Sequence, residues 1–375
     1  MLDYPRFYPD QVIPPDRFGD RTEHLRQIEY TLRAIQEGRP RGAMICGERG
    51  IGKTSLLNKA ESMCLERKIL PLHIALHEFE EVREFYDTIF EEVGSALKSI
   101  GLWEKFRVAV GEFEKGWDYV VRLQKRPRTL QAEVHERLSL LLDKMTRRGH
   151  QSLVFFLDES DGLKAHVTGL QILRNVWTSL TQSGHRLGFF FAGSENLVES
   201  LGRYSPLKRH CIPVHLKRFK MLECVEVMAK LEEGAAHKLT PLVRSRIAEL
   251  SGGYPHYLHV LGSHAVEAMK KGEQDVWAEA FKSYLFETNA YEAVITRAAH
   301  VSETQQRILA HMDFLGPTTP KNIAQESGVS QDTIPAQLQR LIQAGIVRKA
   351  GRGKYEIADR DLAEYIRISL GGKSA

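Results

Sequence analysis

Residues 47–54 read GERGIGKT, a glycine-rich stretch that ends in lysine and threonine. It matches the pattern GxxxxGK[ST], in which glycines let backbone N–H groups turn inward around phosphates and the lysine reaches the β and γ phosphates. An apolar run at 43–46 precedes it and an amphipathic helical pattern follows it, as the motif requires. The sequence therefore predicts a nucleotide site with these residues: Gly47, Glu48, Arg49, Gly50, Ile51, Gly52, Lys53, Thr54 and Ser55.

A second motif, LVFFLDE at 153–159, supplies an apolar strand that ends in two acids. Asp158 and the Thr54 hydroxyl are predicted to hold Mg²⁺ beside ATP. Glu159 is predicted to orient and deprotonate the attacking water, a task that a pure binding switch does not need. The alternative is that both acids only cap a strand end.

Short apolar runs alternate with helical stretches across the first half of the chain, a pattern typical of a parallel sheet covered on both faces. The predicted fold class is therefore α/β, with a five-stranded parallel sheet of the P-loop NTPase type. An all-helical domain and a C-terminal winged helix-turn-helix follow it. The predicted boundaries are an ATPase core at 1–216, with a charged helical insertion at 101–128, helices at 217–300 and a winged helix at 301–375. The predicted strands lie at 43–46, 69–76, 153–157, 187–192 and 211–214.

The amino-acid composition excludes few classes of protein. The 52 Lys and Arg residues against 48 Asp and Glu give a net charge of +4, which does not demand a polyanionic partner. The four cysteines are too few for a disulfide framework in 375 residues. No apolar run approaches the ~20 residues that cross a bilayer, and the N-terminus lacks signal-peptide features. We therefore expect a cytoplasmic protein that does not use a membrane.

The C-terminal segment predicts three helices, at 303–312, 321–326 and about 331–344, followed by a two-stranded hairpin around the turn at 351–353. The third helix would enter the major groove of DNA. Asp332 at its start and Pro335 in its first turns argue for a wing that docks on protein instead. The residues predicted to contact DNA are Gln331, Thr333, Gln337, Arg340, Arg348, Lys349, Arg352 and Lys354.

Taken in order, these motifs resemble the AAA+ superfamily, in particular the ATPases related to replication-origin recognition proteins and to STAND signalling ATPases. The resemblance covers most of the chain. It includes RFGDRTE at 17–23, which is similar to FxGRxxE with its arginine displaced by one residue, a fourth strand ending at Ser194, SPLKR at 205–209, and GGYP at 252–255.

The resemblance implies further roles. Phe18 would lie against the adenine, and Ser194 would be the polar sensor at the γ phosphate. Arg209 would be the finger that stabilises transition-state charge, in cis or from a neighbouring subunit of a homo-oligomer, with Arg203 and Lys208 as rivals. Pro255 would belong to a GxP element in a helical lid at 217–300.

Three functions fit these features. The first is an ATP-hydrolysing protein, with slow or partner-stimulated turnover, whose nucleotide state controls assembly and engagement of double-stranded DNA through the winged helix. The second is a STAND-like signalling or scaffolding switch that acts on a protein partner without DNA. In the third, residues 101–128 dock a protein that the ATPase delivers to DNA.

Overall fold

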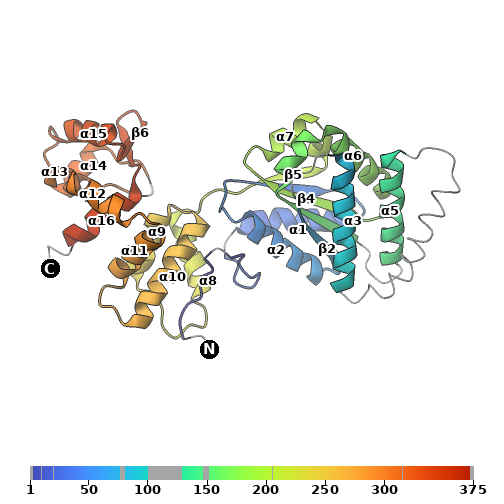
Figure 1. Cartoon of the computed structure of the whole chain (residues 1–375), viewed down its shortest axis with the longest axis horizontal. Helices are drawn as coiled ribbons and strands as arrows, with labels where there is room; N and C mark the ends of the chain where they lie inside the picture. Colours follow the sequence, from blue (N-terminus) through green and yellow to red (C-terminus); the bar gives the residue numbers. More distant parts are fainter. Residues whose placement is uncertain are drawn as a thin grey trace. The chain divides into compact units, whose positions relative to one another are not determined.

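The computed structural model describes residues 3–9, 11–19, 21–76, 81–99, 129–146, 152–204, 206–314 and 316–371. The predicted insertion at 101–128 lies outside the described residues. The chain divides into two compact units, one at 14–217 and one that joins 1–13 to 218–375. Each unit is described by itself (Figure 1).

The unit at 14–217 is an α/β domain. Its elements are α1 (Thr22–Gln36), β1 (Gly42–Cys46), α2 (Lys53–Glu66), β2 (Ile69–Ala75), α3 (Val82–Ser99), α5 (Leu130–Thr146), β3 (Ser152–Asp158), the 3₁₀ helix η1 (Ser160–Ala165), α6 (Val167–Gln182), β4 (Leu187–Gly193), α7 (Leu197–Tyr204), the 3₁₀ helix η2 (Pro206–Arg209) and β5 (Cys211–His215).

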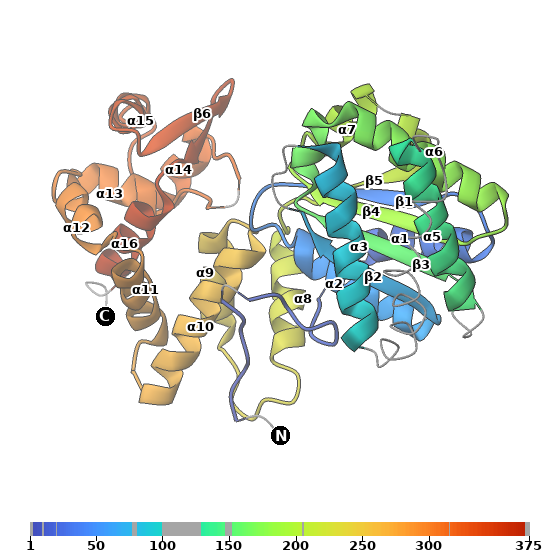
Figure 2. The same ribbon diagram turned by 45° about the vertical axis from the view of Figure 1, so that its right-hand side comes forward.

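All five predicted strands form one parallel sheet in the order β2-β3-β4-β1-β5. Helices α1 and α2 pack on one face, and α3, α5, α6 and α7 on the other (Figure 2). Because both faces are covered, the central strands β1, β3 and β4 are buried along their whole length. The predicted α/β fold class is confirmed.

Aromatic packing fixes the register of the inner strands. Phe155 on β3 stacks on Phe189 of β4 with ring centroids 4.9 Å apart, and Trp177 of α6 meets Phe189 edge-on at the same distance. The Trp177 indole N–H donates to the Leu187 carbonyl at 2.9 Å, so its polar atom is satisfied while the ring is buried. This packing aligns the carboxyl ends of β1, β3 and β4, where the two nucleotide motifs lie.

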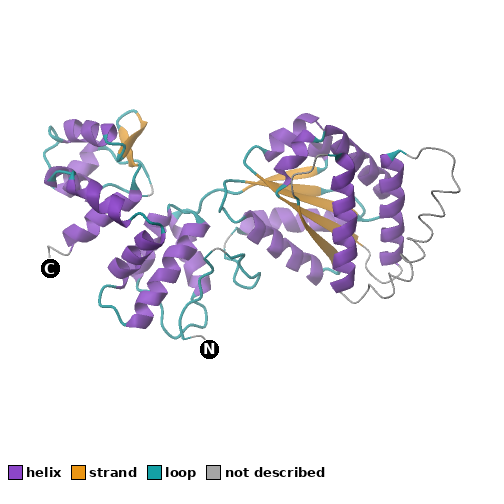
Figure 3. Cartoon of the chain, in the orientation of Figure 1, coloured by secondary structure: helices purple, strands orange, loops and turns teal. Residues whose placement is uncertain are grey.

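The other unit is helical apart from one hairpin (Figure 3). Its elements are α8 (Met221–Leu231), α9 (Pro241–Ser251), α10 (Pro255–Lys271), α11 (Val276–Glu287), α12 (Tyr291–Ala299), α13 (Glu303–Ala310), α14 (Pro320–Ser327), α15 (Ile334–Gln343), β6 (Val347–Gly351), β7 (Lys354–Ile357) and α16 (Arg360–Gly371). Strands β6 and β7 pair antiparallel, and Thr318 bridges to Tyr355, which adds a short third edge.

This division differs from the predicted three domains in two respects. The break after Lys217 falls within one residue of the predicted boundary, but residues 218–300 and 301–371 share one hydrophobic core. Residues 1–13 also join this unit, because Phe7 and Tyr8 pack against His259 of α10. The Tyr8 N–H donates to His259 Nδ1 at 3.2 Å. Charge and periodicity in a short N-terminal segment do not reveal such a distant partner.

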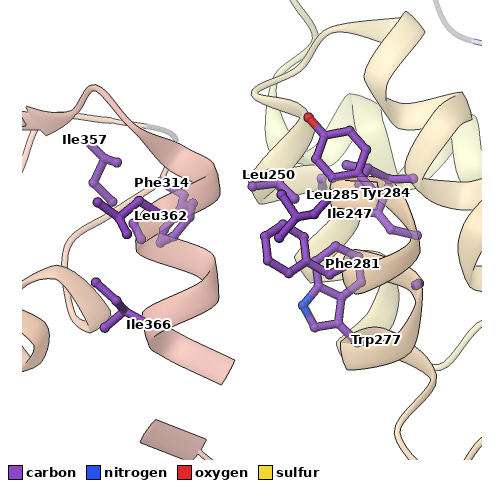
Figure 4. Close-up of a cluster of buried hydrophobic side chains, with 14 of the residues drawn as sticks. Ile247, Leu250, Trp277, Phe281, Tyr284, Leu285, Phe314, Ile357, Leu362 and Ile366 are labelled. Carbon is purple, nitrogen blue, oxygen red and sulfur yellow. The ribbon is translucent and has the colours of Figure 1, made fainter. Parts of the chain in front are cut away.

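The shared core contains side chains from both parts of this unit. Figure 4 labels Ile247, Trp277 and Phe281 from the lid helices, and Leu362 and Ile366 from α16. All five are buried in one cluster. Helix α16 packs against α9, α12 and α13, so the last helix of the chain connects the lid to the helices that follow it.

Candidate functional site

The loop from β1 to α2 has the backbone of a phosphate-binding loop. Gly50 and Gly52 have φ values of +76° and +96°, which side chains beyond glycine rarely adopt. Lys53 begins α2, and its Nζ donates to the carbonyls of Gly47 and Glu48 at 3.0 and 2.9 Å. These bonds hold the ammonium across the mouth of the loop, next to the helix N-terminus.

The LDE motif at the end of β3 contacts the phosphate loop through a hydrogen bond. The Thr54 hydroxyl donates to Asp158 Oδ2 at 2.7 Å, and the Glu159 N–H donates to Asp158 Oδ1 at 2.9 Å. Asp158 is buried at the end of β3. The hydroxyl and the carboxylate are hard oxygen ligands of the kind that Mg²⁺ prefers, so the donor set fits this ion.

Glu159 is exposed and has a φ of +55°, a left-handed conformation that costs a glutamate free energy. It lies directly before the 3₁₀ helix η1. The surrounding structure therefore holds an acid in a strained position one residue beyond the predicted metal ligand. Such strain is concentrated at functional sites in proteins.

Burial lowers the pKa of Lys53, whereas the carboxylates of Asp158 and Asp161 act in the opposite direction. The lysine is thus partly desolvated and faces two acids. A partly desolvated ammonium interacts more strongly with a phosphate than an exposed one does.

Asp161 is a residue that the sequence analysis missed. Its carboxylate accepts from both the backbone N–H and the hydroxyl of Ser194, each at 2.7 Å. Ser194 directly follows β4, the strand between β3 and β1. Asp161 thereby fixes the predicted sensor beside the acids of β3. The only signal in the sequence was one more acid shortly after the LDE motif.

Arg21 is a second missed residue. It lies at the start of α1 with a φ of +68° and is buried. Its guanidinium donates to the Ile51 carbonyl in the phosphate loop at 3.2 Å and to the Lys217 carbonyl at 2.6 Å. The displaced arginine of the entry segment therefore supports the phosphate loop from behind.

The remaining predicted nucleotide contacts lie on three other segments of the chain. Phe18 is half-buried in the segment before α1. Pro255 is buried at the start of α10 in the other unit. Arg209 is exposed just before β5. Because β5 runs parallel to β1, Arg209 lies at the amino edge of the sheet, one strand length of about 13–17 Å from the phosphate-loop edge.

The predicted DNA contacts gather on α15 and the hairpin. Helix α15 begins at Ile334, later than predicted, because Pro335 takes a first-turn position where no N–H is needed and restricts the residue before it. Gln331 and Thr333 therefore precede the helix, whereas Gln337 and the exposed Arg340 lie on it. Gln337 and Thr333 are half-buried.

The hairpin carries the exposed basic residues. Arg348 pairs with Glu356 across the two strands, which neutralises part of its charge. Lys349, Arg352 and Lys354 are exposed and form no ion pair with any other described residue. The basic surface of this segment is therefore concentrated at the hairpin rather than on α15.

The parallel sheet and the phosphate loop define a P-loop nucleotide-binding fold. Residues 17–189 match the family model of the AAA ATPase domain, and this match contains β1 to β3, the phosphate loop and the LDE motif. The search of curated proteins found no significant match.

Two solved structures share the fold. The Walker-type ATPase PABY2304 of Pyrococcus abyssi is 20% identical, with a TM-score of 0.50 over 95% of this chain and 99% of that chain. Cdc6p from Pyrobaculum aerophilum is 14% identical, with a TM-score of 0.54 over 98% of this chain and 97% of that chain. At these identities the likeness concerns the fold alone. Among the described residues, no helix is long and apolar enough to span a membrane.

Proposed function

We propose that this protein binds and hydrolyses ATP, and that its nucleotide state controls engagement of double-stranded DNA by the C-terminal segment. The observation that carries the ATPase part is the pairing of Thr54 with Asp158, with Glu159 held exposed at the next residue. ATP with Mg²⁺ would supply the phosphoryl group and neutralise part of its charge.

Each part of the site has its own role in binding and hydrolysing ATP. The loop at 47–52 and Lys53 bind the phosphates, and Thr54 and Asp158 provide oxygen ligands for the metal. Glu159 holds the position of a base that accepts a proton from water. Ser194, oriented by Asp161, presents a hydroxyl at the tip of the neighbouring strand. Arg209 precedes β5 and so lies at the opposite edge of the sheet from the phosphate loop of its own chain. We therefore assign Arg209 to the phosphate loop of a second copy and expect turnover to depend on assembly.

The DNA part rests on the hairpin. Three exposed cations without ion pairs among the described residues lie on one two-stranded wing next to α15, and such a group suits the phosphates of a duplex. The order of α13, α14, α15 and the β6–β7 hairpin supports the proposal that this segment is a winged helix-turn-helix. The Thr318–Tyr355 bridge, which adds a short edge to the hairpin, supports it too.

The experiment is ATP turnover by the full chain, with and without double-stranded DNA at ~0.1 M salt. We expect DNA to stimulate turnover, and we expect Glu159→Gln to abolish turnover while ATP still binds. Lys53→Ala should abolish ATP binding itself. If Lys53→Ala binds ATP as well as the wild type, the proposed site is wrong.

Other outcomes of these measurements would support one of the two alternative functions. Negligible turnover, tightly retained nucleotide and no salt-dependent DNA affinity would instead support a signalling switch that acts on a protein partner. Loss of partner recruitment on deletion of 101–128, with ATPase activity unchanged, would support the delivery of a protein to DNA.

A further inference from the structure

A cavity of about 460 Å³ lies within the helical unit, between the GGYP turn and the start of α16. Its walls include Tyr254, Tyr257 and Tyr284 from the lid helices, and Asp359, Arg360 and Asp361 from the other side. This volume and this mixture of aromatic and charged side chains fall within the range of small-molecule sites. The nucleotide motifs belong to the other unit and contribute none of the lining.

Most charged groups of the cavity have a partner. Arg297 forms an ion pair with Asp359, whose other oxygen accepts from the Leu362 N–H at 3.0 Å. The Asp361 carboxyl interacts with the Tyr284 hydroxyl, and burial raises the pKa of Asp361 to about 6. These groups need no ligand.

Arg360 differs from the other charged residues of the cavity in its contacts. Among the described residues it forms no hydrogen bond and no ion pair, although its side chain is half-buried. Burial lowers the pKa of Arg360, and the nearby cation of Arg218 lowers it further. Arg218 in turn stacks on the Tyr254 ring at 4.1 Å. Arg218 does not line the cavity, and the Glu356 carboxylate acts on the pKa of Arg360 in the opposite direction, so Arg360 is the guanidinium available to a ligand.

The backbone makes room for this arginine. Gly252 has a φ of +59°, and a β carbon at this position would lie 1.5 Å from the Arg360 Nη1 atom. A simpler explanation is that Arg360 only caps the last carbonyls of α9. However, a capping arginine donates to those carbonyls, and Arg360 donates to no described residue.

We propose that this cavity binds a phosphorylated small molecule that carries a flat ring, as a nucleoside monophosphate does. The phosphate pairs with Arg360, since a guanidinium has five donors in a fork that matches two phosphate oxygens. The ring lies against the tyrosine faces, where Tyr257 is 43% exposed and meets Tyr254 edge-on. The site is built from residues of the helical unit alone, and the proposal does not depend on DNA binding.

The test is isothermal titration calorimetry of the full chain in a Lys53→Ala background, with AMP as the probe and adenosine as its uncharged counterpart. We expect saturable AMP binding, with adenosine at least 10-fold weaker. Arg360→Gln should weaken AMP binding by about 10- to 100-fold, the loss typical of a charge-assisted bidentate pair. The control Lys271→Gln, an exposed lysine at the end of α10, should leave the affinity unchanged.

Circular dichroism of each variant checks the fold. If Arg360→Gln does not fold, Tyr257→Ala provides the second test, because its exposed ring can be removed without opening the core; we expect a loss of several-fold in AMP affinity. The proposal is overturned if AMP does not bind saturably, if AMP affinity is unchanged in the variant that folds, or if AMP binds the wild type but not Lys53→Ala.

Discussion

At the scale of single residues, Asp161 is the clearest addition to the nucleotide site. Its carboxylate accepts two hydrogen bonds from Ser194, so Asp161→Ala removes both and leaves the Ser194 hydroxyl without this acceptor. Removing a hydrogen bond to a charged group typically costs ~1.5–3 kcal/mol. We expect kcat for ATP to fall by about 10-fold or more, with the KM for ATP little changed. Steady-state kinetics at saturating Mg²⁺ measures both.

The control is the double variant with Ser194→Ala. If Asp161 acts only through Ser194, the double variant should be no slower than the slower single variant, because the two changes remove the same interaction. Fully additive losses would show that Asp161 acts in another way.

His259 makes the stability of the protein depend on pH. Burial lowers the pKa of His259 to about 4 from an ordinary 6.5, and the imidazole accepts from the Tyr8 N–H. Between these values the unfolded chain binds more protons than the native one, so the free energy of unfolding falls as the pH falls from 6.5 to 4. A shift of this size corresponds to ~3 kcal/mol. Asp361, whose pKa is raised to about 6, has the opposite sign in an overlapping window.

A comparison of the wild type with His259→Asn isolates the contribution of this histidine to the pH dependence of stability. His259→Asn keeps an acceptor for Tyr8 but cannot titrate, so its stability should fall less between pH 6.5 and 4. Hydrogen exchange of the α10 amides at several pH values measures this difference. Parallel pH profiles of the wild type and the variant would refute the role of His259.

Local sequence decides the geometry of the phosphate loop and of the strand end that carries Asp158. Lys53, Thr54 and Asp158 lie where the motifs place them, because the loop and the strand end are fixed by short-range structure. Asp161 and Arg21 were missed, because their importance arises from contacts with Ser194 and Ile51 that only the folded sheet creates. A charged residue in a loop carries no mark of such a partner in the sequence.

Among the secondary-structure elements, the strands were predicted more accurately than the start of helix α15. The five strands are continuous apolar runs and were predicted within a few residues, whereas α15 begins later than its periodicity suggested. Pro335 explains the shift, since proline restricts the residue before it and is tolerated in a first turn. The polar residues at the predicted start of α15 therefore belong to the preceding turn, and the hairpin becomes the stronger candidate for DNA contact.

The hairpin predicts a specific salt dependence. Replacing Lys349, Arg352 and Lys354 together by Gln should weaken binding to duplex DNA of any sequence. The slope of log affinity against log salt should become shallower by about 0.9 for each DNA phosphate that the variant no longer neutralises. Fluorescence anisotropy between ~0.05 and ~0.2 M salt measures the slope. Lys271→Gln, an exposed lysine at the end of α10, is the matched control and should change nothing. An unchanged slope in the triple variant would exclude the hairpin as the DNA-binding surface.

At the scale of the whole molecule, the helical unit joins the lid helices to the last helix through a buried polar network. The Trp277 indole N–H of α11 donates to Glu364 Oε1 of α16 at 2.7 Å, and Glu364 is 1% exposed. Arg367 of α16 approaches Glu364 Oε2 at 3.3 Å and Glu249 of α9 at 2.6 Å. We therefore predict that a displacement of α9 or α11 carries α16 with it.

Glu364 is the residue that tests this connection. Burial raises the pKa of Glu364, whereas Arg367 and Arg246 oppose the shift, so the carboxylate is held by partners that Glu364→Ala would leave unpaired. We expect Glu364→Ala to cost ~3–5 kcal/mol, the usual penalty for breaking a buried pair, and Glu364→Gln to cost much less because it keeps an acceptor for Trp277. Hydrogen exchange should then rise in α11 and α16 together in the Ala variant. Faster exchange confined to α16 would show that the lid and the C-terminal segment unfold independently, and nucleotide control of the hairpin would need another route.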